Sequence, residues 1–130
     1  MAEPIRVVHA ADISDRTAQT PGMTRRTAID GDSVGARTLW MGRVSTDPGM
    51  KSGAHHHGDS ESAIFVISGN LRMLFGDGLG ESVEAGAGDY IYVPANCVHI
   101  EMNASDSEPA DVIVVRDNQE NIVVPVETGG

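Results

Sequence analysis

Three consecutive histidines, His55, His56 and His57, lie in the middle of the sequence. Side chains alternate between the two faces of a β-strand, so a strand here places His55 and His57 on one face and His56 on the other. Glu61 follows four residues after His57, and His99 lies in a later segment. Imidazole nitrogens and a carboxylate on one concave face are suitable ligands for a divalent first-row transition metal. A solvated histidine-rich turn is the alternative interpretation.

The elements that must position these histidines are predicted to be short strands. Apolar, β-branched runs alternate with Gly, Pro and Asp turn signals, which is typical of an all-β sandwich or barrel. The segment 1–32 is polar and predicts an extended arm with one short strand at Ile5–His9, before a single domain at 33–130. The runs Asp111–Arg116 and Ile122–Val126 predict a closing hairpin. The other predicted strands are Arg37–Ser45, Ala63–Ile67, Leu71–Phe75, Ser82–Ala85 and Tyr90–Val93.

Composition and charge limit the classes of function. The 130 residues suffice for one ordinary domain with one hydrophobic core. The formal net charge is −10 at pH 7. Nucleic acids and anionic membranes are bound through Lys and Arg, so we expect neither as a partner. The single cysteine, Cys97, excludes an intrachain disulfide. Residues 1–30 contain no apolar stretch typical of a signal peptide, so we expect a cytoplasmic protein.

Two spaced motifs carry a resemblance to a known family. Gly49, five residues, His55-x-His57, three residues and Glu61 resemble the first cupin motif. The second cupin motif is similar to GDYIYVPANCVHIEMN, which contains Gly88, Pro94, Asn96, His99 and Asn103 at the family's spacing. Asn96 stands where the family usually has glycine. Asn is the common substitute where φ is positive, so we expect the turn to persist.

The spacing of the first motif leaves one ligand position open. The family usually has six residues between its ligand glutamate and the glycine that ends the motif, whereas seven separate Glu61 from Gly69. Counting back from Gly69 places Ser62 in the ligand position, and counting forward from His57 places Glu61 there. A hydroxyl is a poor ligand for these metals, so we expect Glu61 to be the ligand, with a local bulge or a longer turn. A three-histidine site completed by water is the alternative.

The resemblance implies a fold, a cofactor and a class of function. It implies an all-β, cupin-type jelly-roll barrel of two antiparallel sheets. It also implies one divalent transition metal ion per chain, Zn, Ni, Mn or Fe. Small cupins commonly form homodimers, and the arm could extend an open sheet edge of a second copy. The family covers dioxygenases, isomerases, decarboxylases and lyases, so we expect a metalloenzyme that acts on a small organic molecule, with the reaction unspecified. A non-catalytic module that binds a small ligand or a metal is the alternative. The implied metal ligands are His55, His57, Glu61 and His99.

Three further residues are candidates for contact with a substrate. Alternation from His99 places Glu101 on the face of the metal ligands, where it can act as a general base. Arg43 can clamp a substrate carboxylate if it points into the barrel. Trp40 lies on the opposite face of the same predicted strand, so only one of these two residues faces the interior. Tyr92 can contact the ligand through its phenol. Structural alternatives are a charged strand end for Glu101 and simple packing for Tyr92.

Overall fold

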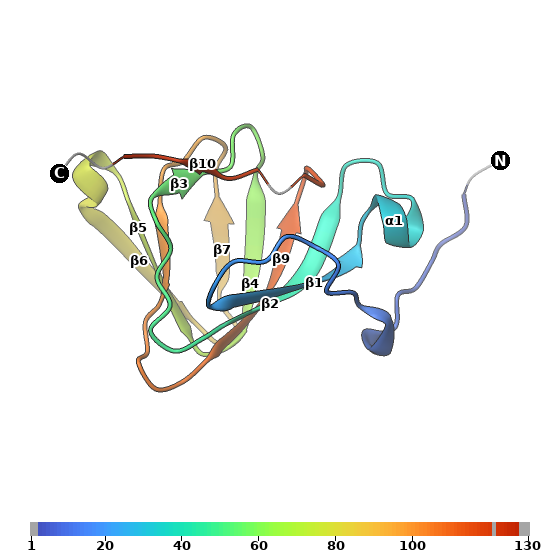
Figure 1. Ribbon diagram of the computed structural model, residues 1–130, viewed down its shortest axis with the longest axis horizontal. Helices are drawn as coiled ribbons and strands as arrows, with labels where there is room; N and C mark the ends of the chain where they lie inside the picture. The colour runs from blue at the N-terminus through green and yellow to red at the C-terminus, as the bar shows by residue number, and fades with distance from the viewer. Residues whose placement is uncertain (1–2, 121, 128–130) are drawn as a thin grey trace.

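The computed structural model describes residues 3–120 and 122–127, which fold into antiparallel sheets around one interior (Figure 1). The larger sheet has the strand order β1-β2-β9-β4-β7, and the smaller has the order β6-β5-β8. Both sheets contribute to one apolar core, so they face each other in the expected all-β jelly roll. The larger sheet contains β1 (Met23–Ile29), β2 (Trp40–Thr46), β4 (Ser62–Ser68), β7 (Tyr90–Val93) and β9 (Ala110–Arg116). The smaller contains β5 (Asn70–Phe75), β6 (Glu81–Gly86) and β8 (Ile100–Asn103).

The interior is built by residues that alternate along the strands. Buried and exposed side chains follow each other along β2 and along the first half of β4, as a half-buried strand requires. Val66 on β4 lies directly opposite Val112 on β9, and both are at most 1% exposed. Leu71 covers them from the smaller sheet and is equally buried. Burying a side chain of this size contributes about 1.5–3 kcal/mol, so these positions anchor the two sheets.

Two tight turns between strands require residues that tolerate a positive φ. Gly69 joins β4 to β5 with φ at +84°, and an added Cβ would lie 2.7 Å from the backbone of Ala110. Only glycine fits there without moving the backbone. Asn96 has φ at +58°, which confirms that asparagine sustains the turn of the second motif. Its backbone N–H donates to the Gly58 carbonyl at 2.7 Å, so this turn braces the loop that follows His57.

The N-terminal segment differs from the expectation in the place of its strand. Residues Ile5–His9 form no strand, and Ile5 is 98% exposed. The strand forms instead at β1, which pairs with β2 along its length and buries Met23 and Thr27. The strand forms at β1 because this segment lies beside β2, which supplies hydrogen-bond partners, and because one of its faces packs against the interior. A short helix, α1 (Gly31–Val34), follows β1, while residues 3–9 run away from the barrel (Figure 1).

The expected closing hairpin is wrong, because the last segment pairs elsewhere. After β9 the chain crosses over the loop Ser60–Glu61, where the Asp117 carboxylate accepts hydrogen bonds from the Ser60 hydroxyl and the Glu61 N–H. It then forms β10 (Val124–Pro125), which pairs with β3 (His55–His56). The last segment therefore covers the histidine-bearing strand (Figure 1). None of the helices in the described ranges is long and apolar enough to cross a membrane.

Candidate metal centre

The structure brings His55, His57 and His99 together at one end of the barrel. One ring nitrogen from each lies within 4.8 Å of the others. His55 and His99 are direct cross-strand partners, since each backbone N–H donates to the other's carbonyl, at 3.0 and 2.9 Å. Such a pair projects its side chains to the same face. His57 lies two residues beyond His55 and reaches the same face, whereas the His56 ring accepts a hydrogen bond from the Gly58 N–H and stays outside the cluster.

Backbone carbonyls orient all three imidazoles. The Nδ1 atoms of His55, His57 and His99 lie 2.8, 2.7 and 2.8 Å from the carbonyl oxygens of Gly53, Ile122 and Cys97. A carbonyl oxygen can only accept, so Nδ1 carries the proton in each neutral ring and the lone pair remains on Nε2. Metal-binding histidines are held in this way, with the second ring nitrogen bonded to a carbonyl or carboxylate. The donor set therefore fits a transition metal.

Burial keeps the inner rings neutral. Burial, together with the neighbouring histidines and Arg116, lowers the pKa of His57 to about 4, against the hydrogen bond to Ile122. Burial also lowers the pKa of His99. Because a protonated imidazole has no lone pair to offer, these shifts keep the nitrogens available at neutral pH.

The structure corrects the expectation about Glu61. Its carboxylate accepts a hydrogen bond from the Tyr92 hydroxyl at 3.0 Å in an exposed position, and in the described part of the chain no carboxylate joins the histidine cluster. Ser62 faces inward instead, directly opposite Arg116 and Val93. A bulge does occur in β4, but it lies at Ile67, too far along the strand to turn Glu61 inward.

Two cavities share His99 as part of their walls. The first has a volume of about 270 Å³ and an apolar wall that includes Met73, Phe75, Val83, Ile91 and Cys97. The second, about 50 Å³, lies deeper and is lined by His57 and Ser62 together with Arg25, Glu101 and Arg116. His99, Met73 and Val93 line both, so the two spaces adjoin at the cluster. The arrangement can hold a metal at the junction of an apolar space and a charged one.

Glu101 lies in the interior, as alternation from His99 predicts. Burial raises the pKa of its carboxyl, and the charge of Arg25 acts in the opposite direction. Among the described residues that line these two cavities, it is the only carboxylate. A carboxyl group with a raised pKa beside a binding cavity is suited to proton transfer.

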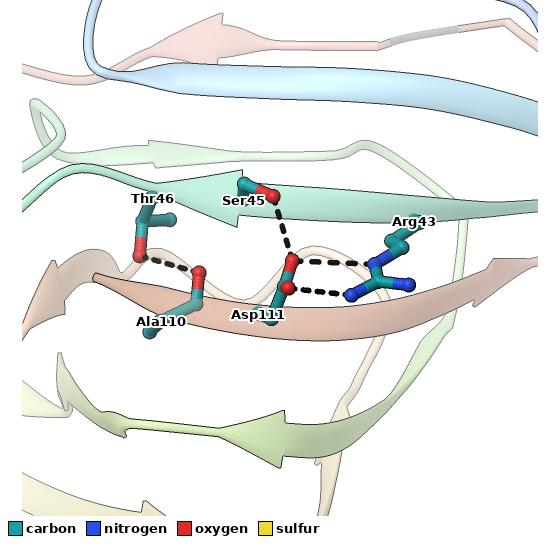
Figure 2. A network of polar contacts seen from close by, with 5 residues as sticks. All are labelled: Arg43, Ser45, Thr46, Ala110 and Asp111. Carbon is teal, nitrogen blue, oxygen red and sulfur yellow. Dashed lines mark hydrogen bonds and ion pairs between the residues drawn. The ribbon is translucent and has the colours of Figure 1, made fainter.

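Arg43 is not placed where a substrate clamp needs it. It lies on the outer face of the larger sheet, where its guanidinium donates to the Asp111 carboxylate at 2.6 Å (Figure 2). The Ser45 hydroxyl donates to the same carboxylate, and Arg43 lowers the pKa of Asp111. Of Trp40 and Arg43, Trp40 is the one that faces inward. Tyr92 also faces outward, but it lies at the edge of the apolar cavity, and its hydrogen bond to Glu61 raises the pKa of the phenol.

Arg25 and Arg116 are the interior residues that sequence reasoning missed. Arg116 ends β9 at an inward position and packs over the Trp40 ring, with its guanidinium carbon 4.2 Å from the ring centroid. Arg25 lies at an inward position of β1 and donates to the Thr20 hydroxyl at 2.8 Å. The alternation of Val112, Val114 and Arg116 is visible in the sequence and could have indicated the inward arginine.

Comparisons with known proteins agree with this architecture. The family model of the cupin domain matches residues 42–116. A curated Streptomyces cyaneus protein named polyketide synthase CurC is 29% identical over 103 residues, which cover 79% of this chain and 64% of that protein. The chain thus spans less than two thirds of that relative's length.

Solved structures share the fold. The polyketide cyclase RemF from Streptomyces resistomycificus matches with a TM-score of 0.77 at 24% identity, over 95% of this chain and 87% of that one. Oxalate decarboxylase from Bacillus subtilis matches with a TM-score of 0.69 at 24% identity, over 83% of this chain and 28% of that one. At these identities the likeness concerns the fold alone.

Proposed function

Because the chain belongs to the cupin domain family, we propose that it is a metal-dependent enzyme acting on a small, largely apolar organic molecule of the polyketide type. The observation that carries the proposal is that His99, one of the three clustered histidines, lines an apolar cavity of about 270 Å³. Ligand sites of this kind are mostly apolar, with a few polar groups that set orientation. The names of the relatives, a polyketide synthase and a polyketide cyclase, support the choice of substrate class.

His55, His57 and His99 are proposed to hold one divalent transition metal ion, Zn, Ni, Mn or Fe, through their Nε2 atoms. Three protein ligands leave coordination positions open to water or substrate, as catalytic sites require. A metal bound there supplies a Lewis acid that polarises a carbonyl oxygen. Glu61 is omitted from this set because its carboxylate binds Tyr92 outside the cluster.

The reaction that fits these groups is an intramolecular aldol condensation. Glu101 accepts a proton from a carbon next to a carbonyl group, and that carbon forms a bond to a second carbonyl carbon of the same molecule. The proton returns to the alkoxide oxygen, which becomes a hydroxyl group. Glu101 then takes a second proton from the same carbon and gives it to the departing hydroxyl group, so that water leaves and a carbon–carbon double bond forms. The raised pKa of Glu101 suits a group that must both accept and return a proton. The apolar wall of the cavity favours a folded conformation of the substrate over an extended, hydrated one.

Metal content and turnover test the proposal together. We expect about one metal ion per chain in protein purified without a tag, measured by elemental analysis. His57→Ala should lose both the metal and the conversion of a synthetic poly-β-ketone to its dehydrated ring product, followed by mass spectrometry. His56→Ala is the matched control and should retain both, because its ring lies outside the cluster. A full complement of metal without any turnover would favour the non-catalytic binding module.

A further inference from the structure

Three charged side chains line the deeper cavity inside the barrel, and their charges bear on which ligands can bind there. Arg25, Glu101 and Arg116 line the deeper cavity beside His57 and Ser62. Two positive charges and one negative charge therefore face a small space in a chain whose formal net charge is −10. Arg25 and Arg116 thus present two guanidinium groups to this space, and guanidinium groups are suited to binding a carboxylate.

The three charges are not equivalent. Glu101 and Arg25 act on each other, since each shifts the other's pKa towards its charged form. Arg116 is 6% exposed and has Trp40 and Ser62 directly opposite it on the two neighbouring strands. Burial lowers its pKa to about 10, and the like charge of Arg25 acts in the same direction, so it remains cationic at neutral pH.

The apolar cavity leads to these charges. Among the described residues that line it there is no arginine, lysine, aspartate or glutamate. The two cavities share Met73, Val93 and His99 as walls. A ligand whose body fills the first cavity therefore directs its end past His99 towards the space that Arg116 lines.

We propose that the site is selective for an apolar monocarboxylate, with the apolar body in the cavity of Phe75, Val83 and Ile91 and the carboxylate bound by Arg116. The inference deepens the proposed function, and rests on it in taking this cavity as the ligand site. Arg116 thus has the role that the sequence suggested for Arg43. A guanidinium matches a carboxylate in charge and in planar geometry.

The test uses metal-free protein, so that a carboxylate cannot bind through a metal ion. Cyclohexanecarboxylate and cyclohexanecarboxamide have nearly the same shape and differ in charge. The single tryptophan, Trp40, lines the deeper cavity and contacts Arg116, so its fluorescence reports binding, with calorimetry as a second measurement. A charge-assisted hydrogen bond predicts that the carboxylate binds about tenfold or more tightly than the amide.

Substitutions identify the group responsible. Arg116→Met should abolish the preference for the carboxylate, and Arg116→Lys should retain part of it. Arg43→Met is the matched control: it removes the same charge from the outer face and should leave the preference unchanged. Ser62→Asp places a carboxylate opposite Arg116 and should remove the preference while the amide still binds.

Equal binding of acid and amide by the wild-type protein overturns the inference, as does a preference that survives in both Arg116→Met and Ser62→Asp. The wild-type comparison remains decisive if Arg116→Met does not fold. Metal content, measured separately, distinguishes failure of this inference from failure of the proposed function: a protein that binds metal but does not discriminate acid from amide refutes only the former.

Discussion

His57 should make the metal-free protein sensitive to mild acid. Burial lowers the pKa of this ring from 6.5 to about 4. Between these two values the unfolded chain binds a proton at His57 that the folded chain does not. The free energy of unfolding therefore falls as the pH is lowered through this window, and the contribution of His57 is fully present only above about pH 6.5.

The size of the effect follows from the same shift. Each pKa unit corresponds to about 1.4 kcal/mol, so the interval between 6.5 and about 4 corresponds to a loss of about 3 kcal/mol. This is a large part of the stability of a single domain, which is about 5–15 kcal/mol. Protonation of His99, whose pKa is also lowered, adds to the loss in the same direction.

Urea unfolding of metal-stripped protein, followed at neutral pH and near pH 4.5, measures the loss. His57→Asn retains an amide N–H that can donate to the Ile122 carbonyl but has no proton to bind in this range. Its stability should decrease by about 2–3 kcal/mol less than that of the wild type over the same interval. His56→Asn is the control and should follow the wild type. Identical pH dependence in His57→Asn and the wild type would refute the assignment of a buried, neutral ring.

Three other predictions concern the parts of the structure around the site. Glu61→Ala should leave metal stoichiometry unchanged in elemental analysis, because its carboxylate bonds to Tyr92; loss of the metal in this variant alone would restore Glu61 as a ligand. Asp111→Asn should lower the free energy of unfolding by less than about 1 kcal/mol at neutral pH, because the ion pair with Arg43 is partly exposed. Arg43 lowers the pKa of Asp111, so this contribution is present above the ordinary aspartate pKa of 3.8 and decreases as the pH falls below it; a difference between variant and wild type that does not decrease with pH in urea titrations would contradict the pairing. The chain should form a homodimer in light scattering at tens of micromolar, and deleting residues 1–12 should weaken it, since Ile5 and Val7 are 98% and 73% exposed in the single chain; a monomer at this concentration would exclude the dimer.

Local patterns in the sequence were sufficient for the all-β class and for the side-chain directions of the histidine triplet, while the jelly-roll barrel and the place of His99 beside it followed from the resemblance to the two cupin motifs. Strand alternation separates His56 from His55 and His57, and turn signals such as Gly69 and Asn96 mark where strands end. These features depend on a few adjacent residues and on backbone geometry that each residue type permits, so they can be read without knowing the partner strands.

The register between paired strands determined which side chains face the interior where the local sequence pattern did not. Glu61 and Ser62 are neighbours, and a shift of one residue exchanges the faces they occupy. Pairing of Ser62 with Arg116 and Val93 sets the face, and the residues of that ladder come from three separate segments. Pairing with β9 likewise determines that Trp40, and not Arg43, faces the interior. The strand β1 forms because β2 offers it an open edge to pair with. Because of this long-range pairing, the hydroxyl of Ser62 faces the interior where the carboxylate of Glu61 was expected. For the same reason the interior cation is Arg116, whereas Arg43 was the candidate from the sequence.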